Sequence, residues 1–173
     1  MFKILATLDG SPESEAALPA VQQLAGIRPH VLLLTVVEPA TATARSAVGR
    51  TVPESPYVMP GATTAIVVER PDEPEWAEDK DQALQRVLDQ GRDYLAKYAR
   101  TLQAAGLEVD FDAVIAEDVS DAIANYARQH DIDLIIMATH GRSGLSELVQ
   151  GSVASAVVRT GVAPVTLVRP KRG

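Results

Sequence analysis

Cysteine is absent from this chain, which excludes disulfide bonds and thiolate metal sites and fits a reducing compartment. Aromatic residues make up only 4% of the sequence, so a core must be built mainly from Ala, Val, Leu and Ile. No apolar run approaches the roughly 20 residues that cross a bilayer, and only a short one, residues 4–8, precedes Asp9. These absences predict a soluble, cytoplasmic protein with no membrane partner.

Basic residues are also scarce, because 16 Lys and Arg stand against 23 Asp and Glu and give a formal net charge of −7. A protein that binds nucleic acid without regard to sequence needs a basic face that neutralises phosphates. We therefore expect no nucleic-acid partner. A single bound nucleotide stays compatible with this charge, since backbone N–H groups and a few Arg side chains supply a local positive field.

The sequence does contain apolar runs that alternate with helical periods. A length of 173 residues suits one domain with a real core, and we expect a single domain over residues 1–173. The predicted strands are residues 4–8, 31–37, 107–115, 134–137 and 165–168. The predicted helices start at Ser11, at about Glu78, at Ser120 and at Ser152. This alternation implies a three-layer α/β fold, a doubly wound parallel sheet with helices on both faces.

A few residues mark the expected helix ends. Ser11 followed by Pro12 is typical of an N-cap with proline at the first helical position, and Ser120 is the expected cap of a later helix. Pro19 removes one backbone hydrogen bond, so we expect the first helix to bend there. Gly106 is expected to end the long helix.

Residues 38–76 depart from this alternation. Six of the eleven prolines fall in this segment, which is too long for an ordinary connection and contains one short strand-like stretch, residues 64–68. The segment follows strand 31–37, so it starts at the carboxyl edge of the sheet. There it is a lid over a ligand, a segment that reaches a partner, or a tolerated insertion.

Two loops are expected to meet at that edge. If the sheet reverses direction between strands 4–8 and 134–137, their carboxyl ends lie side by side, and ligands bind at such a switch point. Asp9 follows the first strand, and the 138–152 loop follows the second. Asp9 is a candidate to accept hydrogen bonds from a ribose or to help hold a metal on phosphates. Its structural alternative is an Asx-turn.

The second loop carries residue types that suit a phosphate. Gly141 and Gly151 permit close backbone approach, and Ser152 offers a hydroxyl and an N–H at the start of a helix. His140 and Arg142 are candidates to add positive charge. The structural alternatives are tight turns for the glycines, an N-cap for Ser152, a turn cap for His140 and a solvated Arg142.

Motifs for catalysis are missing. The chain has no Gly-x-x-x-x-Gly-Lys-Ser/Thr, no Gly-x-Gly-x-x-Gly after its first strand, and a Gly141-Arg142-Ser143-Gly144 run that misses the nucleophile elbow by one position. The three histidines, His30, His130 and His140, show no ligand spacing. We therefore assign no catalytic residue and no protein-held metal, and expect ATP turnover to be slow or absent.

The residues named so far resemble the universal stress protein family. The C-terminal signature of that family is similar to three stretches: Ala138-Thr139-His140-Gly141, then, after nine residues, Gly151-Ser152-Val153, and finally Ala163-Pro164-Val165-Thr166-Leu167-Val168. Its N-terminal strand and loop are similar to Lys3-Ile4-Leu5 and Asp9-Gly10-Ser11. The resemblance covers about residues 1–37 and 80–170 and leaves the proline-rich segment outside.

The resemblance implies a five-stranded sheet in the order 3-2-1-4-5 and an ATP-binding subtype. Its Gly-x-x-Gly motif corresponds to Ala138 and Gly141, so alanine replaces the first glycine. The residues and the resemblance together give these candidate nucleotide contacts: Thr7, Asp9, Val36, Met137, Ala138, His140, Gly141, Arg142, Gly151, Ser152 and Val153. The implied ligand is ATP, AMP or another adenine nucleotide, with Mg²⁺ held through the phosphates.

Family members also commonly dimerise by pairing the last strand, which here implies a homodimer through residues 165–168. Two functions stay open. The first is a nucleotide-binding sensor or regulator of the stress response. The alternative is an interaction module of the same fold that binds no nucleotide and acts through its dimer surface and long loop.

Overall fold

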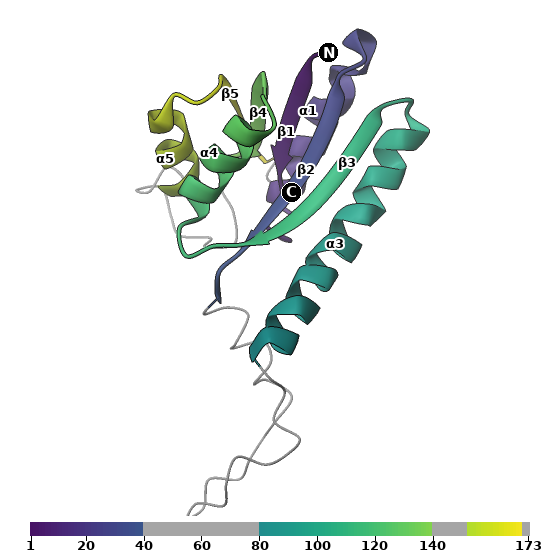
Figure 1. The fold of residues 1–173 in the computed structure, drawn as a ribbon. Helices are drawn as coiled ribbons and strands as arrows, with labels where there is room; N and C mark the ends of the chain where they lie inside the picture. Colours follow the sequence, from purple (N-terminus) through teal and green to yellow (C-terminus); the bar gives the residue numbers. More distant parts are fainter. Residues whose placement is uncertain (40–79, 140–151, 171–173) are drawn as a thin grey trace, which may run out of the picture.

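The computed structural model describes residues 1–39, 80–139 and 152–170 of the chain. These residues form three layers, with a β-sheet between two layers of helices (Figure 1). The predicted insertion over residues 38–76, with its expected short strand, lies almost entirely outside the described residues.

Five parallel strands form the sheet in the order β3-β2-β1-β4-β5. Their bounds are β1 Lys3–Thr7, β2 His30–Val37, β3 Glu108–Ile115, β4 Leu134–Ala138 and β5 Val165–Val168. The order confirms both the doubly wound α/β fold predicted from the sequence and the strand order that the family resemblance implies. The first and last residues of each predicted strand lie within one residue of the observed bounds.

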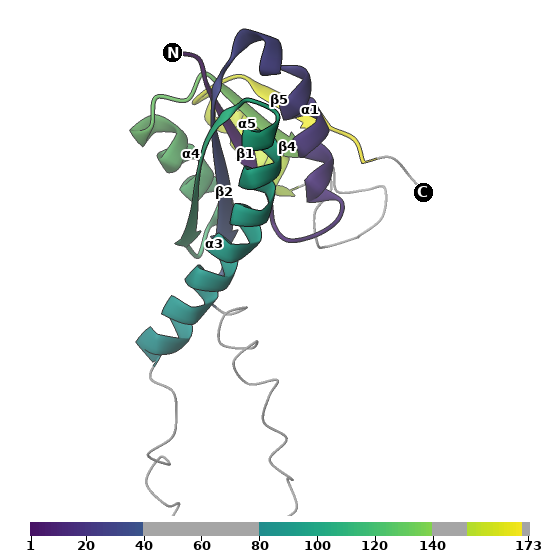
Figure 2. The same ribbon diagram turned by 90° about the vertical axis from the view of Figure 1, so that its right-hand side faces the viewer.

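Helices cover both faces of the sheet, as predicted (Figures 1 and 2). The helices on one face are α1 (Ala17–Gln23) and α3 (Lys80–Ala104), and those on the other face are α4 (Val119–Gln129) and α5 (Ser152–Thr160). Two short 3₁₀ helices, η1 (Ser14–Ala16) and η2 (Ala25–Ile27), flank α1. In the described part of the chain, no helix is both long and apolar enough to cross a membrane.

Side chains of the central strands alternate between two apolar clusters. In β1, Ile4 and Ala6 belong to the cluster beneath α1 and α3, whereas Leu5 belongs to the cluster beneath α4 and α5. Leu33 and Leu34 of β2 divide in the same way. Because both faces are covered, these strands carry apolar residues at successive positions, which explains the nearly continuous apolar runs in the sequence.

The first helix begins later than the sequence predicts. Ser11 and Pro12 lie in a turn, η1 follows, and α1 begins only at Ala17. Ser11 still makes a cap-like hydrogen bond, because its Oγ accepts the N–H of Ser14 at 3.1 Å. Pro19 falls in the first turn of α1, where a missing N–H costs no hydrogen bond within the helix. Pro19 therefore gives no reason to expect a bend in α1.

The cap predicted at Ser120 is formed instead by Asp118. Asp118 Oδ1 accepts the N–H of Asp121 at 2.9 Å, and α4 begins at Val119. The Ser120 hydroxyl donates to the same oxygen at 2.6 Å. The hydrogen bond from the Ser120 side chain, followed by that from the Asp121 N–H, lowers the pKa of the Asp118 carboxyl. A carboxylate also carries a negative charge that interacts favourably with the positive end of the helix, and a neutral hydroxyl lacks this charge.

Helix α3 ends at Ala104, and Gly106 terminates it as predicted. Gly106 has a φ of +84°, its N–H donates to the carbonyl of Gln103 at 2.9 Å, and the N–H of Leu107 donates to the carbonyl of Leu102 at 3.2 Å. This pair of hydrogen bonds is a Schellman motif. Leu102 and Leu107 both lie in the apolar cluster beneath α1 and α3, so the helix end is anchored to the core.

Close contact between α3 and the sheet depends on Gly91. A Cβ atom at this position would lie 3.0 Å from the Cβ of Ala113 and 3.0 Å from the Cγ2 of Thr35. Thr35 on β2 and Ala113 on β3 are paired neighbours, and both are buried. The helix therefore packs against both strands at a separation that leaves no space for a side chain.

Candidate functional site

The carboxyl ends of β1 and β4 lie side by side where the strand order reverses. β1 pairs with β2 on one side and with β4 on the other, and the register aligns Ala6 with Ile136. The chain leaves β1 after Thr7 toward Asp9, and it leaves β4 after Ala138. The predicted switch point is therefore confirmed, and open parallel sheets bind ligands in the crevice at such a point.

Hydrogen bonds within the β1–α1 loop fix the position of Asp9. Its Oδ1 accepts hydrogen bonds from the backbone N–H of Ser11 at 2.9 Å and from the Ser11 hydroxyl at 2.5 Å. The N–H of Asp9 donates to Ser14 Oγ at 3.2 Å. Gly10 has a φ of +81°, which permits the sharp turn after Asp9. The Asx-turn is present, and it holds a carboxyl group at the carboxyl edge of the sheet.

Three predicted nucleotide residues lie in one apolar cluster beside this edge. Val36 on β2, Met137 on β4 and Val153 on α5 all belong to the cluster beneath α4 and α5. Met137 is only 5% exposed, whereas Val36 and Val153 are half-buried. Thr7, the half-buried last residue of β1, falls on the same face as Leu5 by strand alternation. An apolar surface of this kind suits a planar heteroaromatic ring.

Ala138, which stands where the family motif has its first glycine, adopts an ordinary strand conformation. It is the last residue of β4 and pairs with Val168 of β5. In the described segments, the non-glycine residues with positive φ are Arg28 and Asp131. Alanine at position 138 therefore brings no backbone strain, and the replacement of glycine there needs no compensation.

The β4–α5 connection is described only in part. His140, Gly141, Arg142 and Gly151 lie outside the described residues, so their roles stay sequence predictions. Ser152 is the first residue of α5, which is nine residues long and begins where the sequence predicts. The start of this helix carries backbone N–H groups and a partial positive charge, both of which favour an anion.

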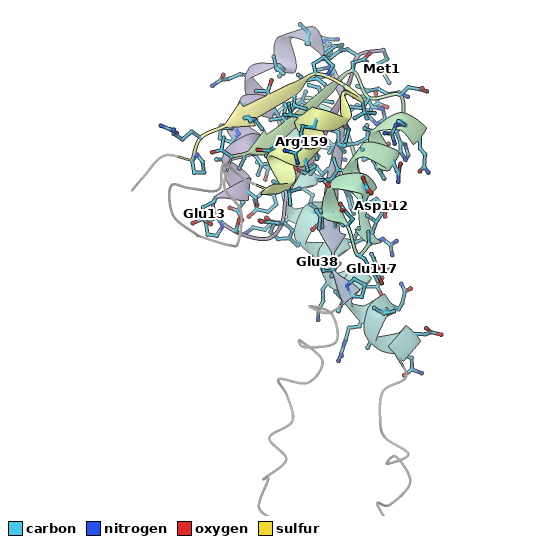
Figure 3. All side chains as sticks on the ribbon, turned by 90° about the vertical axis from the view of Figure 1, so that its left-hand side faces the viewer. Met1, Glu13, Glu38, Asp112, Glu117 and Arg159 are labelled. Atoms are coloured by element: carbon cyan, nitrogen blue, oxygen red, sulfur yellow. The ribbon has the colours of Figure 1, made fainter. Side chains whose placement is uncertain are left out.

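Acidic side chains dominate the described charges near this edge. Figure 3 shows Glu13, Glu38 and Glu117 along the side of the molecule where the strands end, and all three are exposed. Together with Asp9, these carboxylates would repel phosphate groups that have no positive charge beside them. Among the residues that the structure describes, no three His, Asp or Glu side chains group to hold a metal ion.

Ser14 is a contact of Asp9 that the sequence pattern did not predict. It is only 4% exposed, and its hydroxyl donates to the carbonyl of Ser11 at 2.8 Å while accepting the N–H of Asp9 at 3.2 Å. The available signal was the Ser11-x-x-Ser14 spacing, since hydroxyls three residues apart can both bond to the backbone of one turn.

The family model for universal stress proteins matches residues 1–169 of the chain. The chain belongs to this family. One relative in the family, universal stress protein MJ0577 of Methanocaldococcus jannaschii, is 26% identical over 86 residues, which cover 50% of this chain and 52% of the relative. The chain spans about half the length of the curated relatives that it matches.

Solved structures of the family share the fold. The structure of MJ0577 has a TM-score of 0.72 at 20% identity, and the match covers 99% of this chain and 98% of the MJ0577 chain. A universal stress protein in complex with cAMP has a TM-score of 0.52 at 20% identity, with 98% of each chain covered. One from Archaeoglobus fulgidus in complex with dAMP has a TM-score of 0.54 at 15% identity, with 97% of each covered.

Proposed function

We propose that this universal stress protein binds an adenine nucleotide, with ATP as the expected ligand, at the carboxyl ends of β1 and β4. The observation that carries the proposal is that β1 and β4, whose carboxyl ends lead into the Asp9 loop and the β4–α5 connection, are neighbours at the switch point of the sheet. The cAMP and dAMP complexes of two structural neighbours support an adenine nucleotide as the ligand.

The base would lie against the apolar side of the edge. Thr7, Met137 and the backbone of Val36 supply this surface, which Val153 extends on α5. Asp9 would accept hydrogen bonds from the ribose, because its carboxyl group is held at the edge by Ser11. These side chains separate an apolar region for the base from a polar region for the sugar.

The phosphates would lie at the start of α5. The proposed contacts there are Ala138, His140, Gly141, Arg142, Gly151 and Ser152. His140 and Arg142 would offset the negative field of Glu13, Glu38 and Glu117, and Mg²⁺ bound to the phosphates would add further positive charge. The function that follows is nucleotide-dependent sensing or regulation in the stress response, within one domain over residues 1–173, with slow or no hydrolysis.

Calorimetric titration of the purified protein with ATP, AMP and cAMP tests this function. We expect saturable heat with about one nucleotide per chain and the tightest binding for ATP in the presence of Mg²⁺. No heat with any of the three nucleotides up to about 1 mM would contradict the proposal. Phosphate release under saturating ATP is expected to be slow or absent, and rapid release would contradict the assignment of a sensor.

The protein is also proposed to form a homodimer through β5. This strand is the last in the order β3-β2-β1-β4-β5, and Leu167 on it is 44% exposed, so an apolar edge is available for pairing across a two-fold axis. Sedimentation is expected to give a dimer for the unchanged protein and a monomer for Leu167→Glu. Ile27→Glu, at a residue 59% exposed on η2, is the matched control and should stay dimeric. A monomeric unchanged protein would overturn this assignment.

A further inference from the structure

Buried serines connect the Asp9 loop to the start of η1. Ser11 and Ser14 are 5% and 4% exposed, so water has little access to their hydroxyl groups. Ser14 Oγ accepts the N–H of Asp9 at 3.2 Å and donates to the carbonyl of Ser11 at 2.8 Å. Ser11 Oγ in turn accepts the N–H of Ser14 at 3.1 Å. A displacement of Ser14 therefore changes the hydrogen bonds that hold Asp9.

Two tyrosines of α3 reach the same region. Glu15, which follows Ser14 on η1, accepts a hydrogen bond from the Tyr94 hydroxyl at 3.4 Å and a short one from the Tyr98 hydroxyl. The two rings pack edge to face with centroids 5.2 Å apart. Burial, followed by the hydrogen bond to Glu15, raises the pKa of Tyr98 to about 12, so its hydroxyl stays a donor at neutral pH. Glu15 therefore joins η1 to α3.

The peptide bond between Ser14 and Glu15 completes the connection. Burial, followed by the charge of Glu15, raises the pKa of Tyr94, so its hydroxyl also stays a donor at neutral pH. Ser14 thus bonds to Asp9, while its neighbour Glu15 accepts hydrogen bonds from the two tyrosines of α3. Asp9 and Tyr94 are far apart in the sequence, but two adjacent residues of η1 connect them.

We propose that Ser14 is a positioning residue for Asp9 and that the hydrogen bonds of Tyr94 and Tyr98 to Glu15, the next residue on η1, make the position of Asp9 depend on α3. The effect on ligand affinity rests on the proposed nucleotide function, whereas the coupling between the loop and α3 does not. In consequence, a change in α3 alters nucleotide affinity, and a bound nucleotide alters the protection of α3.

Hydrogen exchange without any ligand tests the coupling. The variants are Ser14→Ala, Tyr94→Phe and the double substitution, with Tyr126→Phe on α4 as the matched control. Tyr94→Phe is expected to speed exchange of the amides from Asp9 to Ser14 by about fivefold, and the control to leave them unchanged. Because Tyr94 is only half-buried, this variant is expected to fold even if Ser14→Ala does not. Unchanged exchange in Tyr94→Phe would overturn the proposal.

Nucleotide affinity provides the second readout. We expect Ser14→Ala and Tyr94→Phe each to weaken ATP binding by about fivefold to tenfold. The double variant should bind ATP no more weakly than the single variant that has the lower affinity. Independent, multiplying effects would mean that the two residues act separately and would overturn the coupling. If the unchanged protein binds no nucleotide, the proposed function fails, and the ligand-free exchange still decides the role of Ser14.

Discussion

ATP affinity is expected to fall at least about 100-fold in the Gly151→Asp variant, equivalent to about 2.7 kcal/mol of binding free energy. The proposed phosphate site lies immediately before α5, whose first residue is Ser152. A carboxylate at position 151 would add a negative charge beside the proposed phosphates and would hinder close backbone approach. Two like charges about 4 Å apart repel each other by about 1 to 4 kcal/mol near a protein surface. Calorimetric titration measures the loss directly.

Gly26→Asp is the matched control for this substitution. Gly26 lies on η2, is exposed, and has no heavy atom within 4 Å of where a Cβ would be placed. This control should bind ATP with unchanged affinity, and circular dichroism should show that both variants remain folded. Unchanged binding in Gly151→Asp would contradict the proposed phosphate site. A partner pulldown that is unaffected by Gly151→Asp would favour the interaction module as the function.

Gly91→Val is expected to lower the free energy of unfolding by about 3 kcal/mol. The first added carbon alone would lie 3.0 Å from atoms of Thr35 and Ala113, and the two further methyl groups would enter the same contact. The Cβ of Ala113 cannot rotate away, so α3 must shift from the sheet or the strands must move. Urea denaturation followed by circular dichroism measures the loss as a lower midpoint.

Two further substitutions separate packing from helix propensity. Gly91→Ala should destabilise the protein less than Gly91→Val, because alanine gains about 1 kcal/mol of helix propensity that offsets part of the contact. Gly26→Val, where a Cβ meets open space, should change stability by less than about 0.5 kcal/mol. Equal stability of Gly91→Val and the unchanged protein would show that α3 does not need this close approach.

The strands were predictable from the sequence because the sheet is covered on both faces. Leu32 and Leu33 point to opposite clusters and both are buried, so a strand in this position shows as an uninterrupted apolar run. Helix starts were less predictable. Asp118 and Ser120 are both good caps two residues apart, and the structure uses the carboxylate as acceptor with the hydroxyl as donor to it. Only the geometry of the turn distinguishes them.

The candidate site was predictable where it depends on topology. Asp9, Thr7 and Met137 follow or end strands whose order the βα alternation and the family resemblance imply, so their common edge could be expected. The hydrogen bonds of Tyr94 and Tyr98 to Glu15 could not be predicted. They join η1 to a helix about 80 residues later, and neither helical periodicity nor a motif relates residues so far apart.

The strand order also determines when the site is assembled during synthesis. Strands β1, β2 and β3, with α1 and α3, are complete once residue 115 has been made, and they can pair among themselves. β4 begins at Leu134 and pairs with Ile4, so the central pair of the sheet closes a loop that contains most of the chain. A nascent or truncated chain that ends before β4 therefore has three adjacent strands but no crevice at the switch point. Only chains that have been synthesised beyond β4 can therefore bind a ligand at that crevice.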